Sequence, residues 1–167
     1  RNKTGSMKQA YEAGLALRSV AAERDMTFIV NDRCDLALAL EADGVHLGQA
    51  DLPLFLARKV VGQKMLIGVS THNPEQVRLA TAEGADYLGF GPIFSTRTKA
   101  NHEPVVGIEG LAGVRGLTTL PIIAIGGIVH GSVPALQAAG ANGVAVASAI
   151  LDAVDRPRVL AEFMAHF

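Results

Sequence analysis

Short runs of β-branched and aliphatic residues alternate with helical segments along most of this chain. Each run is almost continuously apolar and does not alternate with polar residues. This pattern is typical of strands that are buried on both faces of a parallel sheet. We therefore predict an α/β fold, with strands at 27–30, 44–47, 66–69, 87–90, 122–125 and 143–147.

The segments between these strands predict helices. Residues 8–24 place apolar side chains at the spacing of one helix face, at Ala10, Ala13, Leu17, Val20 and Ala21. A single helix is predicted to run from 149 to 164 near the end of the chain. The other predicted helices are 35–41, 53–60, 74–83, 107–116 and 133–139.

A helix-to-strand unit recurs as "EADGVHLG", "EGADYLGFG" and "AGANGVAVAS". Repeated units of this kind build either an open doubly wound sheet or a closed barrel. Polar or glycine-rich residues follow nearly every predicted strand, which favours a barrel, because a barrel builds its site from the carboxyl ends of all its strands. An open sheet would use only the loops at its switch point. We predict a (βα)8 TIM barrel that forms a single domain over 1–167.

Composition narrows the class of protein. The chain is 49% hydrophobic and 19% charged, as expected of a globular domain. Its formal net charge is −1, which argues against nucleic acid as a partner. No apolar run approaches the roughly 20 residues of a membrane span. The lone Cys34 cannot form an internal disulfide and favours a reducing compartment. We predict a cytoplasmic protein, and the sequence leaves a homo-oligomer open.

A phosphate site is predicted at the last two strand ends. Gly126 and Gly127 follow one strand, and glycine lets backbone N–H groups approach an anion. Ser148 adds a hydroxyl and the N-terminus of the final predicted helix, which would point at the phosphate. The alternative is that the two glycines form only a tight turn.

A metal site is predicted from two carboxylates. Asp32 and Asp51 follow neighbouring strands, and such a pair suits Mg²⁺ that also binds water and substrate phosphate. Alternatively, Asp51 is the N-cap of the helix that follows Leu52 and Pro53. His46 is expected to line the barrel wall, and no His/Cys cluster has zinc spacing.

Diphosphate binding is predicted for two further segments. The sequence "STRTK" carries Thr96, Thr98 and Lys99, two hydroxyls and a cation, although it could also be a solvated loop. Arg1 and Lys3 would face the barrel interior if they end a strand, and would otherwise form a frayed tail. Cys34 has no identifiable histidine partner, so nucleophilic catalysis is only weakly supported.

Taken together, these motifs resemble the thiamine-phosphate synthase family. The matching pieces cover essentially the whole chain in the family's order: "RNK", "FIVNDRCDLALALEADGVHLGQADLP", "IGVSTHNPEQ", "GADYLGFGPIFSTRTK", "PIIAIGGI" and "GANGVAVASAI". The resemblance implies a transferase that joins hydroxymethylpyrimidine diphosphate to a thiazole phosphate and releases pyrophosphate. It implies a dissociative reaction, in which pyrophosphate leaves before the thiazole nitrogen bonds to the pyrimidine methylene. Such chemistry needs charge neutralisation and positioning rather than a protein nucleophile.

The resemblance also implies roles for individual residues. The diphosphate would be held by Arg1, Lys3, Asn31 and Lys99, and Ser70 would touch the pyrimidine side; these five are the expected catalytic residues. Mg²⁺ would be bound by Asp32 and Asp51. The thiazole phosphate would contact Thr96, Thr98, backbone at Gly127 and the loop at Ser148. Ser95 stands where the family commonly has proline, which we expect to loosen the loop without abolishing function.

The family's barrel starts with a strand, a helix and a second strand that ends in Gln-x-Arg-x-Lys, whereas this sequence starts at the arginine of that pattern. We therefore expect the chain as given to lack the first strand, the first helix and most of the second strand, roughly 40 residues of a typical barrel. We expect a polypeptide that starts at Arg1 not to be a stable, active monomer, because two parallel edges would be unpaired. Expression of 1–167 alone, with unfolding and turnover measured, tests this.

Three alternatives remain. A thiazole tautomerase-like relative would keep the barrel but not the full diphosphate clamp that Asn31, Asp32, Asp51, Thr96, Thr98 and Lys99 suggest. A non-catalytic phosphate sensor would keep the glycine and serine site without the metal pair, and turnover with both substrates would exclude it. A different phosphate-binding barrel enzyme, such as one of aromatic amino-acid biosynthesis, would need a general acid and base that the sequence does not identify.

Overall fold

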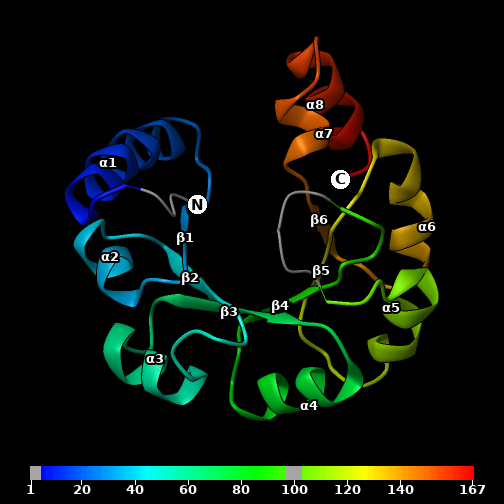
Figure 1. The fold of residues 1–167 in the computed structure, drawn as a ribbon, viewed down its shortest axis with the longest axis horizontal. Helices are drawn as coiled ribbons and strands as arrows, with labels where there is room; N and C mark the ends of the chain where they lie inside the picture. Colours follow the sequence, from blue (N-terminus) through cyan, green and yellow to red (C-terminus); the bar gives the residue numbers. More distant parts are fainter. Residues whose placement is uncertain (1–4, 97–102) are drawn as a thin grey trace. The chain divides into compact units, whose positions relative to one another are not determined.

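The computed structural model describes residues 5–96 and 103–167, and Figure 1 traces its helices and strands. The chain divides into two compact units. The first comprises Arg1–Val69 with Glu83–Asp86, and the second comprises Ser70–Ala82 with Tyr87–Phe167. Each unit is described by itself below, and the single domain over 1–167 stays a prediction.

The first unit is a parallel sheet with helices between its strands. Its elements in chain order are α1 (Met7–Glu23), β1 (Ile29–Asn31), α2 (Cys34–Ala39), β2 (Gly44–Leu47), α3 (Leu54–Val61) and the first part of β3 (Leu66–Thr71). β2 pairs in parallel with both β1 and β3. The register sets Asn31 opposite His46 and Leu47 opposite Val69. Val45 and Ile67 are fully buried, as strands covered on both faces require.

The second unit continues the same pattern. Its elements are the end of β3, α4 (Pro74–Ala82), β4 (Tyr87–Phe90), α5 (Gly107–Arg115), β5 (Ile122–Ile125), the 3-10 turn η1 (His130–Ser132), α6 (Val133–Ala138), β6 (Gly143–Ala145), α7 (Ser148–Leu151) and α8 (Arg156–Met164). β5 pairs in parallel with β4 and with β6. The core of this unit contains Leu88, Phe90, Leu111, Ile122 and Leu136.

The predicted α/β class with parallel strands is confirmed, and three strands begin and end where the sequence predicted: β2, β4 and β5. β1 starts two residues later than expected and ends at Asn31, β3 continues to Thr71, and β6 ends at Ala145. Most helices match within one or two residues. Closure into a (βα)8 barrel stays a prediction.

The recurring helix-to-strand unit has a structural role at the helix ends. In each copy, the second residue before the strand is a buried alanine: Ala42, Ala85 and Ala141. The residue before that alanine has a positive φ: Glu41 (48°), Gly84 (85°) and Gly140 (99°). Glycine suits this left-handed conformation. In the first copy, Glu41 takes this conformation instead of a glycine.

The residue directly before the strand ties neighbouring strands together. Asp43 and Asp86 each accept a hydrogen bond from a backbone N–H near the start of the preceding strand, from Phe28 at 2.7 Å and from Ile67 at 2.7 Å. Asn142 does the same for Ile122 at 2.9 Å. We call each of these contacts a strand clasp. They lie at the amino ends of the strands, opposite to the ends where the predicted site residues lie.

Two arginines reinforce the strand clasps. Arg58 donates from Nη2 to Asp86 Oδ2 at 2.6 Å and from Nη1 to the Met65 carbonyl at 2.6 Å. Arg115 donates to Asn142 Oδ1 at 3.0 Å and to the Leu120 carbonyl at 2.9 Å. The guanidinium group can serve several carbonyls at once because its donors fork in one plane.

The predicted apolar face of α1 is wrong in part. Leu17 and Val20 are 61% and 53% exposed, whereas Gly14 and Ala21 are buried. Gly14 lies against Leu40, where an added Cβ would be 2.4 Å from Leu40 Cδ1. α1 therefore packs against the rest of its unit through the small residues Gly14 and Ala21, which are two turns apart. Its larger aliphatic side chains are exposed.

The predicted helix 149–164 is also wrong, because two helices occupy this segment. α7 ends at Leu151, and α8 starts at Arg156 after its N-cap Asp155, which accepts a hydrogen bond from the Arg158 N–H at 3.0 Å. Pro157 has no N–H to donate and is tolerated only in the first turn of a helix. The aspartate and proline together start a new helix.

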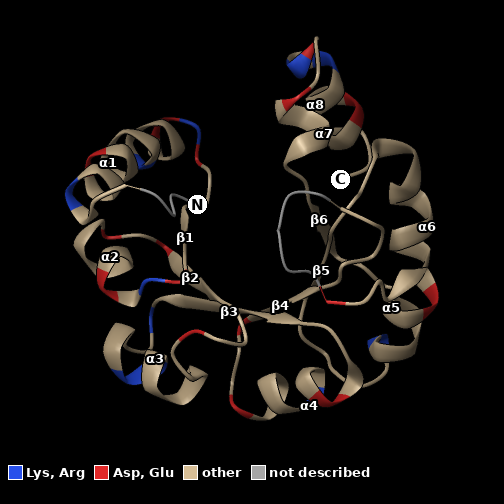
Figure 2. Ribbon diagram, in the orientation of Figure 1, with Lys and Arg blue, Asp and Glu red and all other residues tan. Residues whose placement is uncertain are grey.

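Charges of both signs are interspersed on the surface helices. Figure 2 shows acidic and basic residues together on α1 and on α8. Among the described residues, no helix is both long and apolar enough to cross a membrane.

Candidate functional site

The two predicted metal-binding carboxylates lie at adjacent strand ends of the first unit. Asp32 follows β1 directly, with a φ of 67°, and its N–H donates to the His46 carbonyl at 2.8 Å. Asp51 follows β2 after a short turn. The carboxyl ends of parallel neighbours lie at one edge of a sheet, so both side chains belong to the same edge.

Both carboxylates act electrostatically on His46. Burial lowers the pKa of His46, and the Coulombic influence of Asp32 and of Asp51 opposes that shift. His46 is partly buried on β2, opposite Asn31. A neutral imidazole is favoured by its burial, whereas the two carboxylates favour the charged form.

Asp51 closes a turn and does not cap a helix. The Gly48 N–H donates to Asp51 Oδ2 at 2.6 Å, and the Asp51 N–H donates to the Gly48 carbonyl at 3.2 Å. The residue preceding α3 is Pro53, and no side chain caps this helix. The alternative interpretation of Asp51 as an N-cap is therefore wrong. One oxygen of the carboxylate is held in place by backbone.

These carboxylates fit a hard cation that keeps part of its water shell. Among the residues that the structure describes, no group of three or more His, Cys, Asp or Glu side chains could hold a metal by itself. Mg²⁺ is usually bound through one or two carboxylates together with waters and substrate phosphates. The pair Asp32 and Asp51 suits that mode of binding and not a closed protein cage.

Cys34 lies close to this pair but is a poor nucleophile. Its thiol is free and buried. Burial raises the pKa of Cys34, and the nearby carboxylates of Asp35 and Asp51 act in the same direction. The thiolate is the nucleophilic form of cysteine, so this environment disfavours covalent catalysis at Cys34.

A cavity of ≈ 510 Å³ in the second unit brings together three of the predicted phosphate-binding residues. Thr96, Gly127 and Ser148 all line it, although they come from three separate loops. The remaining lining residues are Ser95, Ala147, Leu151 and Asp152. Hydroxyl groups and glycine backbone are therefore concentrated at the carboxyl ends of β4, β5 and β6.

The conformation of Gly126 and Gly127 requires glycine. Their φ angles are 98° and 64°, a region that other residues rarely adopt. A Cβ atom on Gly127 would lie 2.5 Å from the Ser95 carbonyl oxygen. The chain bends at the two glycines, and Gly127 also lines the cavity.

Ser148 is the first residue of α7, which has only four residues. A full helix dipole needs a longer run of aligned peptides. The expectation that a long helix directs its N-terminus at the phosphate is therefore corrected: the contribution here is a hydroxyl group and local backbone.

The structure locates two other predicted residues. Asn31 is the exposed last residue of β1, and Ser70 is a partly exposed residue near the end of β3. The predictions for Arg1, Lys3, Thr98 and Lys99 lie outside the described residues.

Sequence reasoning missed Asp152 as a residue of the cavity. It is the only charged side chain among the described lining residues. Its distance of four residues from Ser148 was a usable signal, because residues four apart share one face of a helical turn. A carboxylate in a cavity for an anion lowers the affinity by like-charge repulsion.

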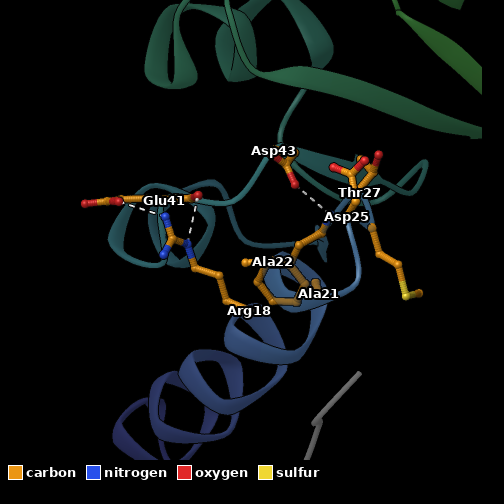
Figure 3. A pocket seen from close by; sticks show the side chains of 9 residues that line it. Arg18, Ala21, Ala22, Asp25, Thr27, Glu41 and Asp43 are labelled. Carbon is orange, nitrogen blue, oxygen red and sulfur yellow. Dashed lines mark hydrogen bonds and ion pairs between the residues drawn. The ribbon is translucent and has the colours of Figure 1, made fainter.

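A second cavity, of ≈ 280 Å³, lies at the amino ends of the strands in the first unit. It is lined by residues that precede β1 and β2 and by one face of α1, including Arg18, Asp25 and Asp43. Figure 3 shows Arg18 extending from α1 to Glu41, to which its Nη2 donates at 2.9 Å. Asp43 is committed to a strand clasp. These groups hold structure together at the end away from Asp32.

The chain resembles thiamine-phosphate synthases in both sequence and structure. A family model described as thiamine monophosphate synthase matches residues 1–150. A thiamine-phosphate synthase of Chloroflexus aurantiacus is 46% identical over 155 residues, which cover 93% of this chain and 71% of that protein.

A solved structure of a thiamine phosphate pyrophosphorylase from Pyrococcus furiosus superimposes on this chain with a TM-score of 0.91 and 36% sequence identity. The match covers 99% of this chain and 79% of that one. A 3-hexulose-6-phosphate synthase structure shares the fold, with a TM-score of 0.67 at 19% identity over 93% of this chain and 81% of that one. The family match over residues 1–150 and the identity to curated relatives lead to one conclusion: the chain belongs to the thiamine monophosphate synthase family.

Proposed function

We propose that this protein joins hydroxymethylpyrimidine diphosphate to hydroxyethylthiazole phosphate, giving thiamine phosphate and pyrophosphate. The observation that carries the proposal is membership of the thiamine monophosphate synthase family over residues 1–150. The enzyme is a transferase, because the pyrimidinylmethyl group moves from the diphosphate oxygen to the ring nitrogen of the thiazole.

The thiazole phosphate is assigned to the cavity in the second unit. The hydroxyl groups of Thr96 and Ser148 and the backbone at Gly127 would donate to the phosphate oxygens, with Thr98 as a further donor. The shared cavity of Thr96, Gly127 and Ser148 supports this assignment. Hydroxyl and backbone N–H donors suit an anion whose position must be fixed but whose charge need not be neutralised.

The pyrimidine diphosphate is assigned to the residues at the strand ends of the first unit and to the cations of two further segments. Asp32 and Asp51 would hold Mg²⁺, whose chemistry would be to neutralise the leaving pyrophosphate. Arg1, Lys3, Asn31 and Lys99 would bind the diphosphate oxygens, and Ser70 would contact the pyrimidine. The position of both residues after the adjacent parallel strands β1 and β2 supports the metal assignment.

The reaction needs no protein nucleophile in this scheme. The carbon–oxygen bond to pyrophosphate breaks, its electron pair leaves with the pyrophosphate, and the thiazole nitrogen then bonds to the pyrimidine methylene carbon. The protein residues bind both substrates, stabilise the departing charge and keep water away from the reactive carbon. The raised pKa of Cys34 supports a mechanism without a thiolate.

The same proposal includes the fold, the partners, the location and the oligomeric state. The fold is a (βα)8 barrel that forms one domain. The partners are small-molecule substrates, with no nucleic acid or membrane. The enzyme acts in the cytoplasm, and a homo-oligomer is compatible with this function. The low net charge of −1 supports small-molecule partners. The free thiol of Cys34 suits a reducing compartment.

The test is turnover with both substrates and Mg²⁺. We expect thiamine phosphate and pyrophosphate in equal amounts, and little pyrophosphate when the thiazole phosphate is omitted. A rate of pyrophosphate release that is the same with and without thiazole phosphate would indicate a hydrolase. Tight binding of thiazole phosphate without any product would indicate a phosphate sensor.

A further inference from the structure

His72 is held in place by the start of α4. The residue directly follows β3, and its backbone N–H donates to Gln76 Oε1 at 2.8 Å. The Gln76 N–H in turn donates to Asn73 Oδ1 at 2.9 Å. Asn73 thus caps the first turn of α4 through its side chain, while the Gln76 side chain holds the residue before the cap. The sequence "HNPEQ" therefore both starts a helix and fixes the backbone that carries the imidazole of His72.

The imidazole of His72 binds the backbone of a distant loop. Its Nδ1 lies 2.5 Å from the carbonyl oxygen of Gly91. A carbonyl oxygen only accepts, so Nδ1 carries the proton and donates. The Gly91 N–H donates to the Thr71 carbonyl at 3.2 Å. Both polar backbone groups of the buried Gly91 are thus held by two consecutive residues at the end of β3.

The loop that starts at Gly91 leads directly to the phosphate cavity. The Ile93 N–H donates to the Ile125 carbonyl at 2.9 Å, and the Phe94 N–H donates to the Gly126 carbonyl at 3.0 Å. A Cβ on Gly91 would be 2.1 Å from the Ile125 carbonyl oxygen. These contacts tie the loop to β5 and to the two glycines that follow it, so we expect a shift at Gly91 to change the position of Thr96.

We propose that His72 is a positioning residue for the thiazole phosphate site. Its Nδ1–H anchors the Gly91 carbonyl, and this anchor sets the distance between Thr96 and Gly127 across the cavity. The identity of the ligand rests on the proposed function, whereas the anchoring contact does not. Loss of the Nδ1 donor leaves a buried carbonyl unpaired, which favours a displaced loop.

The experiment compares three variants with the wild-type protein. His72→Leu removes the donor, and His72→Asn keeps an N–H donor at the same number of bonds from Cα as Nδ1. His130→Leu is the matched control, because His130 is an exposed histidine of the same unit that pairs with Glu162. For each protein, kcat and the KM of each substrate are measured, and the Kd of inorganic phosphate is measured by calorimetry.

We expect His72→Leu to raise the KM for thiazole phosphate by about tenfold, with a smaller change in the KM for the pyrimidine diphosphate. His72→Asn should recover most of the loss, and His130→Leu should behave as wild type. Equal losses in His72→Asn and His72→Leu, or an unchanged KM in His72→Leu, would overturn the inference.

Two measurements keep the inference separate from the proposed function and from folding. If the wild type makes no thiamine phosphate, the proposed function fails, and the inference is judged by whether phosphate binding weakens in His72→Leu and recovers in His72→Asn. If His72→Leu does not fold, nitrogen-15 NMR of the wild-type imidazole decides. A neutral ring protonated on Nδ1 supports the anchor, and a neutral ring protonated on Nε2 overturns it.

Discussion

The carboxylate of Asp51 is held by backbone, and Asp32 has an unusual backbone conformation. The Asp51 side chain accepts a backbone hydrogen bond from Gly48, which limits the rotation of its carboxylate. Asp32 adopts a φ of 67°, a conformation that costs free energy for a residue with a Cβ and is often found at functional sites. Both carboxylates contribute to the electrostatic environment of the partly buried His46.

The first prediction concerns this carboxylate pair. Asp32→Asn and Asp51→Asn should each lower the rate by roughly ten- to a hundredfold, because each removes a charge that holds the metal beside the leaving group. The measurement is the initial rate over a Mg²⁺ titration, in which the variants should need more Mg²⁺. Asp43→Asn is the control, since Asp43 serves a strand clasp at the opposite strand ends. A double variant that is fully active in chelator would exclude the metal assignment.

The second prediction concerns Asp152, the charged residue among the described lining of the cavity that we propose for the thiazole phosphate. Asp152→Asn should tighten phosphate binding by about two- to fivefold at low salt, because it removes repulsion between two anions a few ångströms apart in a solvated site. Calorimetric titration with inorganic phosphate measures this. Asp155→Asn changes the same charge at a helix N-cap outside the described lining and keeps a capping side chain. An equal gain in both variants would show a general charge effect.

At the scale of elements, the strand clasps explain why the helix-to-strand unit recurs. A side-chain oxygen just before one strand accepts the N–H near the start of the preceding strand. In the second and third copies, an arginine from a helix donates to the same side chain. The recurrence in the sequence thus reflects a recurring hydrogen-bonding task at the amino ends of the strands.

The third prediction tests one strand clasp. Asp86→Ala should lower the free energy of unfolding by about 2 kcal/mol, because it leaves the Ile67 N–H without its acceptor and removes the only carboxylate that the Arg58 guanidinium is seen to bind among the described residues. Asp86→Asn should cost less, since an amide oxygen still accepts. Urea denaturation of both variants provides the measurement. Glu83→Ala is the control, because Glu83 is an exposed acidic residue of the same loop, and it should change the free energy of unfolding little. If Asp86→Ala had an effect as small as that of Glu83→Ala, the role of the strand clasp would be contradicted.

At the scale of the whole molecule, the protonation of the partly buried Tyr87 is coupled to unfolding. Burial raises the pKa of Tyr87 to about 12, whereas tyrosine in an unfolded chain titrates near 10. Between these two values the folded state binds the proton more tightly than the unfolded state. The stability that the neutral Tyr87 contributes is therefore complete below about pH 10 and is lost as the pH rises toward 12.

The fourth prediction follows from this sign. The free energy of unfolding should fall between pH 10 and 12, with a contribution from Tyr87 of at most about 1.4 kcal/mol per pH unit. Tyr87→Phe should make the decline shallower, as measured by urea denaturation across this pH range. Tyr11→Phe, on an exposed part of α1, is the matched control. A slope that is the same in Tyr87→Phe as in wild type would contradict the coupling.

The sequence by itself determined the features that depend on local pattern. Continuous apolar runs predicted β2, β4 and β5 to the residue, because a strand buried on both faces is marked by its own composition. The ordered motifs identified the family, which the match over residues 1–150 confirms. The break between α7 and α8 could have been predicted as well, since Asp155 and Pro157 are start signals for a helix.

Only the tertiary structure decided which distant groups meet. It selected the small residues Gly14 and Ala21 as the packing face of α1, because the close approach to Leu40 leaves no room for a larger side chain. It placed Asp152 in the cavity with Gly127 and set His72 against Gly91. Helical and strand periodicities describe one element at a time, whereas these contacts depend on how separate elements pack, and that information is not contained in any local pattern.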